Sequence, residues 1–339
     1  MSINTYGDIS QRTAAWAATE MLAHAKPVMV LAMFGLSKPI PRNKAETVKF
    51  RRPIPFALAT TPLQEGVTPS AGTIRYEDVT VSLLQFGDLK VITDKVNDLA
   101  EDPVLKDGVE LAGEQSGGTL EKVIYGVVKG GTSVFYANGS TRSAVNTPIS
   151  LNKQRKVTRY LKAMKAKKFT KILSGSVQIG TRPIEAAYVA VCHTDLEADI
   201  RNLSTFKTVA EYGQRTPLCE YEIGSVEDVR YVASPDLDAW LDAGGTPGSS
   251  VMSASGSAAD VYPILYFGME AYGLTPLKSA KGSDGKNNMA ITPTVINPDT
   301  VSKSDPLGQR GYIGWKAWFN AVRLNETWMA RLEVAASAL

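Results

Sequence analysis

The sequence predicts an α+β fold in which a long helix and a long two-stranded hairpin accompany a β-rich lobe. Three patterns carry this prediction: an apolar stripe at helical spacing in residues 104–128, alternating strand-like runs at 47–52 and 73–84, and short apolar runs between loops after residue 218. With 339 residues, 44% of them hydrophobic and 21% charged, the chain is long enough for one large domain or two to three lobes.

The first 44 residues are predicted to form an arm that lies on another surface. Residues 10–25 are alanine-rich and indicate a helix that ends before Pro27. A second apolar stretch at 28–34 is followed by an extended Pro39-Ile40-Pro41 segment. Because these pieces are apolar on too many sides to stand alone, we expect the arm to need a partner surface.

Residues 45–88 contain the two strand-like runs, which flank a span rich in Pro, Gly and Thr. In the second run, Val79, Val81 and Leu83 share one face. A two-stranded ribbon has too little core for independent stability. This ribbon therefore either packs on its own domain or reaches a neighbouring subunit.

The long helix is predicted to begin after an Asp102-Pro103 cap and to run to about residue 128. Its stripe consists of Leu105, Val109, Ala112, Ser116, Leu120, Val123 and Val127. At 1.5 Å per residue such a helix is about 40 Å long. Gly117 and Gly118 interrupt it, each costing up to about 1 kcal/mol relative to Ala. The glycine pair predicts a bend, or a break between two shorter helices.

A second helix is predicted within residues 150–169, and no acidic residue occurs between 150 and 184. Its candidate nucleic-acid-facing residues are Lys153, Arg155, Lys156, Arg159, Lys162, Lys165, Lys167 and Lys168. Three interpretations of this basic surface stay open: a solvated face, a salt-bridging face, or a face toward nucleic acid. Contact with DNA would involve phosphates and would not read sequence.

The second half of the chain indicates a β-rich lobe. Strands are expected at 188–192, 229–233, 262–267 and 294–296, with Thr194 or Asp195 capping a helix after the first of them. At the C-terminus, residues 312–324 and 327–335 are expected to pair as a hairpin around Asn325-Glu326.

The sequence provides little material for catalysis. It contains two histidines, His24 and His193, and two cysteines, Cys192 and Cys219, without a CxxC pair. A phosphate loop, a nucleophile elbow and a dinucleotide fingerprint are all missing. We therefore expect a protein that is not an enzyme and has no cofactor or metal site. A hydrolase or metal enzyme with a hidden site is the weakest alternative.

Charge and hydropathy narrow the class further. The net charge of +3 is too small for a nucleic-acid polycation, although a free nucleic-acid-binding protein that uses the basic helix remains an alternative. The N-terminus lacks the basic region of a signal peptide, and the early apolar run is about half of a ~20-residue membrane span. We expect neither export by a standard signal nor a membrane partner.

Three segments carry a resemblance to a known family: LQEGVTP at 63–69, VITD at 91–94 with DPVL at 102–105, and DPLGQRGYIGWK at 305–316. With the order of elements, they make the chain resemble the major capsid proteins of tailed bacteriophages, which have the Hong Kong 97-like (Johnson) fold. More narrowly, the chain resembles the coat family of short-tailed phages related to Enterobacteria phage N-four. The resemblance covers residues 6–336.

The resemblance implies a domain plan and a function. The expected parts are an N-terminal arm (1–44), an E-loop hairpin (45–88), a P-domain with a long spine helix (89–190), an A-domain (191–290), and C-terminal strands that return to the P-domain (291–339). Such subunits form hexamers and pentamers of an icosahedral shell around double-stranded DNA, built in the host bacterial cytoplasm. The alternative with the same fold is the shell of a protein-cargo nanocompartment, similar to an encapsulin.

The implied partners are copies of the chain itself, a portal protein, packaged DNA held by non-specific contacts, and a scaffold or decoration protein. Because the arm begins almost at Met1, we expect a separate scaffold protein or none. The charges predict inter-subunit pairs, with Arg51, Arg52 and Arg75 on the E-loop facing Glu101, Asp102, Asp107 or Glu110 near the spine of an adjacent subunit. Gly117 and Gly118 are the predicted spine hinge.

Overall fold

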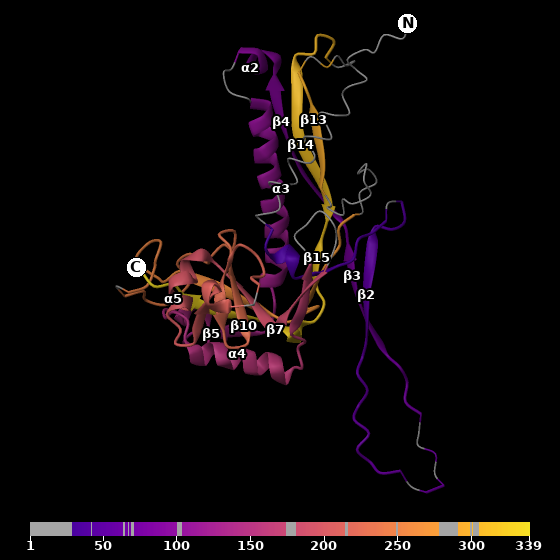
Figure 1. Ribbon diagram of the computed structural model, residues 1–339, viewed down its shortest axis with the longest axis vertical. Helices are drawn as coiled ribbons and strands as arrows, with labels where there is room; N and C mark the ends of the chain where they lie inside the picture. The colour runs from indigo at the N-terminus through magenta and orange to yellow at the C-terminus, as the bar shows by residue number, and fades with distance from the viewer. Residues whose placement is uncertain are drawn as a thin grey trace.

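The computed structural model describes residues 29–41, 43–63, 65–66, 68, 71–99, 104–173, 181–213, 216–248, 250–277, 291–298, 300 and 305–339. The arm helix predicted at 10–25 and the Asp102-Pro103 cap lie outside these residues. The described part of the chain forms an elongated body, a rounded lobe and a projecting hairpin (Figure 1).

The elongated body consists of the spine helix α3 (Val104–Lys129) and a three-stranded sheet beside it (Figure 1). The sheet has the order β13 (Ile291–Ile296), β14 (Arg310–Phe319) and β4 (Leu84–Thr93), all antiparallel. Alternate residues of β14 are buried against the helix, among them Ile313 and Trp315. The short helix α2 (Asp94–Leu99) continues from β4.

The lobe is built on an eight-stranded sheet that combines distant parts of the chain. Its path is β5 (Val134–Tyr136), β16 (Met329–Ala335), β11 (Val261–Phe267), β7 (Thr181–Cys192), β10 (Val229–Ala233), β9 (Glu222–Val226) and β8 (Phe206–Thr208), while β6 (Phe169–Leu173) pairs with β7 off this path. Every residue of β11 is buried, as expected for a central strand covered on both faces.

Alternation along β7 assigns the two faces of this sheet to two hydrophobic clusters. Val189 and Val191 join the cluster that includes the spine helix and the three-stranded sheet. Tyr188 and Ala190 join a second cluster, which α4 (Leu151–Ala163) and α5 (Glu197–Arg201) cover. The lobe and the elongated body therefore share one continuous core along one face of the sheet.

Residues 29–41 connect the spine helix to the rest of the fold. The turn η2 (Leu31–Met33) packs into the first cluster, and β1 (Leu36–Ser37) pairs in parallel with β12 (Tyr272–Leu274), which also pairs with β15 (Ala321–Arg323). The hairpin follows: β2 (Thr47–Pro53), β3 (Tyr76–Ser82) and the residues between them.

Several sequence predictions are confirmed by element type and position. The spine helix, the second helix, and the strands expected at 47–52, 229–233, 262–267 and 294–296 all occur within a few residues of the expected bounds. The second hairpin run ends at Ser82, and a separate ten-residue strand, β4, begins at Leu84. The short helix α2 was not predicted from the sequence.

Three predictions require correction. The C-terminal strands do not form a hairpin, because β14 and β15 pair in other sheets while β16 lies between β11 and β5, and the turn η6 (Glu326–Trp328) separates them. The spine is one continuous helix, so Gly117 and Gly118 do not break it in two. The turn after β7, η4 (Thr194–Leu196), has His193 as its N-cap, where Thr194 or Asp195 was predicted. The His193 side chain accepts a hydrogen bond from the Asp195 backbone N–H.

The domain plan stays a prediction: residue 190, the expected boundary between P-domain and A-domain, lies inside β7, and β16 pairs with β5 and β11. Parallel pairs such as β7 with β10, and β16 with β5, join strands that are far apart in sequence. Local patterns give the strands but not their partners.

Candidate assembly surfaces

The hairpin is attached to the rest of the chain only near its base, among the residues that the structure describes. Phe50 is buried against β12, where a Cβ atom at Gly273 would come within 2.8 Å of its ring. Asn320 Nδ2 donates to the Ser82 carbonyl at 2.7 Å, and Lys38 Nζ donates to the Lys49 carbonyl at 3.0 Å. Beyond Pro53 the two sides of the hairpin extend away from the body (Figure 1).

The projecting part of the hairpin carries large apolar side chains in solvent. Phe56, Leu58 and Leu63 are 69%, 83% and 77% exposed, and Ile54, Ile74 and Tyr76 are also exposed. A cluster of exposed apolar residues on one segment is typical of an interaction surface. The described residues of the projecting part therefore do not pack on their own domain, and contact with a neighbouring subunit stays a prediction.

Two of the three arginines of the hairpin, Arg51 and Arg52, have partners within the same chain that were not predicted from the sequence. Arg51 forms a bidentate pair with Asp78, with donor distances of 2.7 and 2.9 Å, and Arg52 pairs with Glu77 at 2.6 Å. Both pairs join residues directly opposite each other on β2 and β3. A strict register, visible only in the folded hairpin, brings them together.

The other predicted inter-subunit residues are dispersed. Arg75 is exposed beyond the paired part of β3 and makes no ion pair with a described residue. Asp107 is exposed in the first turn of the spine helix, and Glu110 lies 3.6 Å from Lys106 on the same helix. Glu101 and Asp102 lie outside the described residues. Within one chain these groups are not in contact with the hairpin arginines, so their pairing remains a proposal between copies.

A buried carboxyl on the spine helix holds the segment that enters from the arm, and the sequence analysis missed it. Glu121 is fully buried, and its Oε1 accepts a hydrogen bond of 2.7 Å from the Leu31 backbone N–H. Tyr272 Oη donates to the Leu31 carbonyl at 2.6 Å from the other side. Burial raises the pKa of Glu121 to about 8, and hydrogen bonds from backbone N–H groups oppose this shift only in part.

The spine helix is also tied to its sheet by a polar chain. Trp315 Nε1 donates to Gln115 Oε1 at 3.2 Å, and Gln115 Nε2 donates to Asp88 Oδ2 at 2.7 Å. The hydrogen bond from Gln115, with others from Lys90 and Leu89, lowers the pKa of Asp88 to about 2. Asp88 therefore stays ionised at neutral and mildly acidic pH.

Arginines of the last strands bind the C-terminal end of the spine helix. Arg323 Nη1 donates to the Val127 carbonyl at 2.9 Å, and Arg331 Nη1 donates to the Lys129 carbonyl. Such cations satisfy free carbonyls and oppose the helix dipole. Arg331 and Arg142 also bind the buried Glu333, each with a 2.8 Å contact. The joint between spine and lobe is thus fixed by charge as well as by packing.

Gly117 and Gly118 lie in the middle of the continuous spine helix, one buried and the other half-buried. The stripe predicted from sequence faces the core here, with Ser116 and Leu120 buried on either side of the pair. An unbroken helix does not by itself reveal a hinge, so the hinge role remains a proposal.

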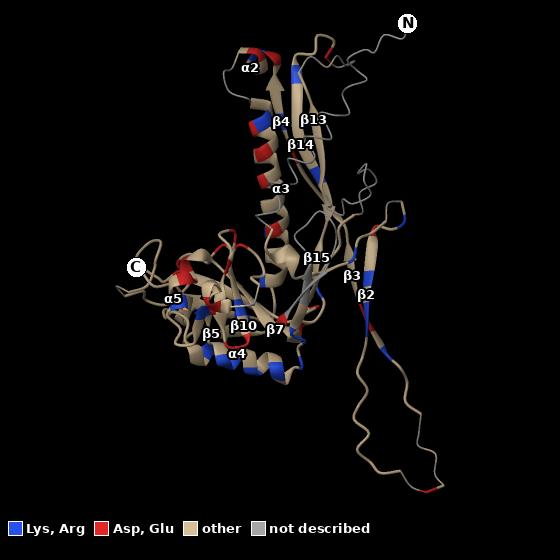
Figure 2. Ribbon diagram, viewed as in Figure 1, with Lys and Arg blue, Asp and Glu red and all other residues tan. Residues whose placement is uncertain are grey.

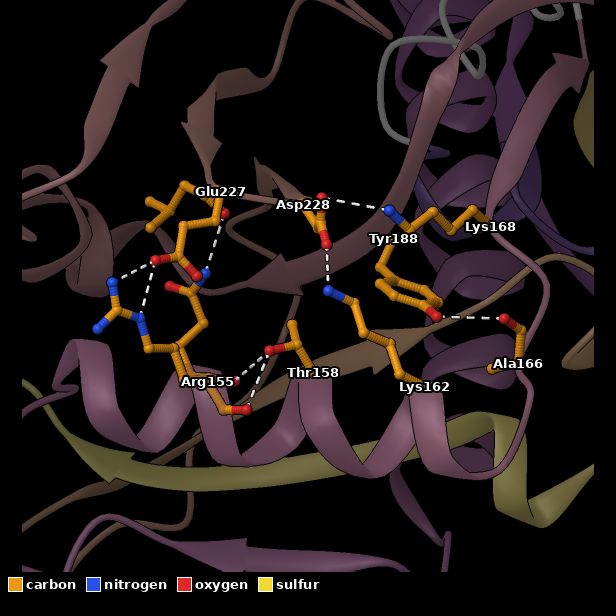
Figure 3. A network of polar contacts seen from close by, with 10 residues as sticks. Arg155, Thr158, Lys162, Ala166, Lys168, Tyr188, Glu227 and Asp228 are labelled. Carbon is orange, nitrogen blue, oxygen red and sulfur yellow. Dashed lines mark hydrogen bonds and ion pairs between the residues drawn. The ribbon is translucent and has the colours of Figure 1, made fainter.

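The basic helix α4 lies at the edge of the lobe, and Lys and Arg recur along its length (Figure 2). Of these, Arg155, Lys156, Arg159 and Lys162 are exposed. Val157 and Leu161 anchor the helix in the core, as the sequence predicted. Acids from the β9–β10 turn neutralise part of this charge: Arg155 Nη2 lies 2.5 Å from Glu227 Oε1, and Lys162 and Lys168 both contact Asp228 (Figure 3). Sequence analysis missed these acids because they come from a turn some 70 residues later.

The described residues contain no group of three or more His, Cys, Asp or Glu side chains arranged to hold a metal ion. His193 contacts Asp195 at 3.1 Å, and Tyr262 Oη donates to the same carboxylate at 2.7 Å. Cys192 is fully buried, and burial raises the pKa of its thiol, which keeps it protonated. No helix in the described part of the chain has the length and apolar character needed to cross a membrane.

Comparison with known proteins decides what these surfaces belong to. The model of the phage capsid protein family matches residues 76–331, which covers most of the chain. The chain belongs to this family. It is therefore a phage capsid protein.

One curated relative agrees with this assignment. The major capsid protein of Pseudomonas phage KPP21 is 22% identical over 181 residues, which is 51% of this chain and 45% of that protein. The match thus spans less than half the length of this relative.

Solved structures show that this capsid protein has the Hong Kong 97-like fold. The capsid of Ralstonia phage GP4 superimposes with a TM-score of 0.67 at 10% identity, covering 92% of this chain and 90% of that one. The head of Helicobacter pylori bacteriophage KHP40 gives 0.58 at 10% identity, with 88% and 87% covered. The holo-SrpI encapsulin complex of Synechococcus elongatus PCC 7942 gives a weaker 0.51 at 11% identity, with 90% and 87% covered.

Proposed function

We propose that this capsid protein assembles with itself into the hexamers and pentamers of an icosahedral shell that encloses double-stranded DNA, and that it has no catalytic role. The projecting hairpin carries the proposal, because Phe56, Leu58 and Leu63 are exposed and no described part of the same chain covers them. A neighbouring copy supplies the missing apolar surface. Each contact is modest and is repeated around the capsomer and over the shell.

Charge assists the same contact. The hairpin carries Arg51, Arg52 and Arg75, while Asp107 and Glu110 lie on the exposed side of the spine helix near its start. We propose that these groups, with Glu101 and Asp102, approach one another between adjacent subunits. Since Arg51 and Arg52 already pair with Asp78 and Glu77, the neighbour adds a second acid to an existing pair. Each such surface pair contributes only about 0–1 kcal/mol.

Further parts of the proposal concern the context of the shell. The side of the lobe that carries the basic helix α4 and the lysines just after it faces the packaged DNA. Gly117 and Gly118 let the spine adapt to non-equivalent positions or to expansion of the shell. A portal protein and a scaffold or decoration protein are the other partners. The protein belongs to the lineage of short-tailed phages related to Enterobacteria phage N-four, and assembly takes place in the host bacterial cytoplasm.

The test is assembly of the purified chain, followed by electron microscopy. We expect closed particles with hexameric and pentameric capsomers. The proposal is contradicted if the chain stays monomeric at high concentration, over a range of salt and pH and with a co-expressed scaffold, although its hairpin is exposed and apolar.

The alternative is a shell around protein cargo, which the likeness to the encapsulin complex keeps in view. Particles purified from infected cells distinguish the two. Nuclease-protected double-stranded DNA of genome length inside the particles supports the phage shell. Particles that hold a defined protein and no protected DNA support the compartment.

A further inference from the structure

The basic helix α4 has two sides that differ in their charge partners, although its sequence contains no acid. One side faces the β9–β10 turn, where Glu227 and Asp228 stand next to each other (Figure 3). Arg155 donates to Glu227 through Nε at 2.8 Å and Nη2 at 2.5 Å. Lys162, seven residues or about two turns along, reaches Asp228, and Lys168 reaches the same carboxylate at 3.2 Å.

These pairs belong to the framework of the lobe. Gln154 Nε2, buried on the same helix, donates to the Val226 carbonyl at 3.0 Å, and the Tyr188 N–H donates to the Asp228 carbonyl at 2.8 Å. The turn is therefore fixed in place beside the helix. The hydrogen bond from Lys162 lowers the pKa of Asp228, so the acid remains charged and the pair remains closed.

The other side of α4 has no acid within reach in the described part of the chain. Lys153, Lys156 and Arg159 follow one another at intervals of three residues, or about 4.5 Å along the axis. Lys153 Nζ donates to the Tyr136 carbonyl at 3.2 Å, and Lys156 Nζ lies 5.7 Å from the centre of the Phe135 ring. These contacts orient two cations without neutralising them.

Lys165 extends this open side just beyond the C-terminal end of the helix. It is exposed, has a positive φ of 54°, and makes no ion pair with any described residue. Lys167, by contrast, lies 3.4 Å from Glu270.

We infer that Lys153, Lys156 and Arg159 of α4, with Lys165 just after the helix, contact the phosphates of packaged double-stranded DNA, while Arg155, Lys162 and Lys168 hold the fold. This inference rests on the proposed function as a DNA-enclosing shell. A cation releases a condensed counterion from DNA only if its own charge is available. An arginine already bound by a carboxylate must first break that pair, and so gains little from a phosphate.

The chemistry of the open side fits a duplex backbone better than single strands or a specific sequence. Its aromatic neighbour Tyr160 is half-buried and shares a 2.8 Å hydrogen bond with Ser133, so it is not available to stack on bases. A row of cations without exposed rings binds phosphates and reads neither sequence nor unpaired bases.

Binding of a 30-base-pair duplex to the full-length, unassembled chain tests the inference, measured by fluorescence anisotropy over a salt series. The double variant Lys156→Ala with Arg159→Ala is compared with the matched control Arg155→Ala with Lys162→Ala. Each pair of substitutions removes two positive charges from the same helix. The first pair of substitutions is expected to make the negative slope of log K against log salt less steep by about 1.8, at about 0.9 per lost phosphate contact. The control is expected to keep the slope of the native chain.

Several outcomes overturn the inference. Equal slope losses in the two variants show that only total charge matters, and unchanged slopes in both show that α4 does not contact DNA. If the native chain does not bind the duplex at all, the same conclusion follows, that α4 does not contact DNA. If the first variant keeps the native slope but no longer forms particles, the open side binds an acidic neighbour instead.

Two further measurements keep the results interpretable. Circular dichroism melts identify a variant that has lost its fold, and conservative Lys156→Gln with Arg159→Gln then replaces the alanine pair. Particle formation by the native chain is scored separately. Failure to form DNA-filled particles contradicts the proposed function itself, whereas DNA-filled particles with an unchanged salt slope in the first variant contradict only the assignment of residues.

Discussion

The hairpin and the lobe use the same kinds of residues in opposite ways. In the lobe, Tyr231 and Tyr266 are fully buried and their hydroxyl groups lie 2.8 Å apart. In the hairpin, Phe56 and Leu58 are largely exposed. The lobe meets its apolar needs within one chain, and the hairpin does not. The difference indicates which part folds alone and which part requires assembly.

The charges show the same contrast. Glu333 in the lobe is fully buried between Arg142 and Arg331, whereas the pairs of Arg51 and Arg52 in the hairpin are exposed. Loss of one partner of a buried pair costs about 3–5 kcal/mol, and loss of an exposed pair costs about 0–1 kcal/mol. Substitutions in the two regions therefore separate effects on assembly from effects on folding.

The largest effect is expected from the hairpin tip and should appear in assembly alone. Phe56→Ser with Leu58→Ser removes apolar surface that is already exposed in the single chain. The free energy of unfolding should change by less than about 0.5 kcal/mol, and particles should be lost. Denaturant unfolding and electron microscopy measure the two effects. Normal particle yield from a folded variant refutes the role of the tip.

The lobe should respond in the opposite way. Leu332→Ala, at a fully buried position in β16, is expected to lower the free energy of unfolding by about 2–5 kcal/mol. Any folded fraction should still assemble, because Leu332 is remote from solvent. If particle yield falls only in proportion to the folded fraction, the lobe acts on folding and not on assembly, as expected. A fully folded variant that does not assemble contradicts this expectation.

A pH-dependent effect is expected at Glu121. Because burial raises its pKa from the ordinary 4.5 to about 8, the folded chain binds a proton that the unfolded chain releases. Stability from this group is complete below pH 4.5 and is lost as the pH rises to about 8.

Glu121→Gln should remove this slope and stabilise the chain by a few kcal/mol at high pH relative to the native protein. Urea midpoints at pH 5 and pH 9 measure it. Glu110→Gln, a partly exposed carboxylate on the same helix, is the control and should keep the native slope. An unchanged slope in Glu121→Gln is evidence against a proton held at this site.

A smaller effect is expected at the glycine pair of the spine. Gly117→Ala with Gly118→Ala removes backbone freedom and should stiffen the helix. Gly126→Ala is the matched control, because a Cβ atom there meets nothing within 4 Å, and it should stabilise the chain by about 1 kcal/mol without changing assembly. If the glycine pair adapts the spine, only the double variant impairs assembly or expansion. Normal particles and normal expansion of that variant exclude the hinge.

The smallest effect on assembly is expected at the charges of the hairpin. Arg51→Glu with Arg52→Glu places like charges opposite Asp78 and Glu77, which should destabilise the hairpin slightly and reduce particle yield. Adding Asp78→Arg with Glu77→Arg restores both pairs within the hairpin in swapped form. If the neighbour also supplies acids, the four-fold variant does not regain native yield. Full recovery shows that the pairs act only inside the hairpin.

Much of the fold could be predicted from local patterns. The apolar stripe from Val109 to Leu120 predicted the spine helix, and the alternation through Val79 and Val81 predicted a strand of the hairpin. Both predictions were possible because helical and strand periodicity can be recognised within one continuous segment. Strand order could not be predicted, since β16 lies between β11 and β5 through contacts that no local pattern encodes. For the same reason the prediction of a C-terminal hairpin was wrong.

The features of the candidate surfaces also divide into those that were visible in the sequence and those that depend on the fold. Exposed cations on α4 were visible in the sequence, but their neutralisation by Glu227 and Asp228 depends on a turn brought close by the fold. Glu121 was missed because a glutamate on a helix is ordinarily exposed, whereas here the fold buries it and brings the Leu31 backbone N–H to it. One signal was present, since Glu121 follows Leu120 within the apolar stripe.

We propose that another copy of the chain completes the hairpin as an assembly surface. A cryo-electron microscopy map of particles formed by the native protein tests this proposal. We expect Phe56, Leu58 and Leu63 to be buried against a neighbouring subunit in every capsomer. A map in which the hairpin tips remain in solvent, with the shell held by other surfaces, contradicts it.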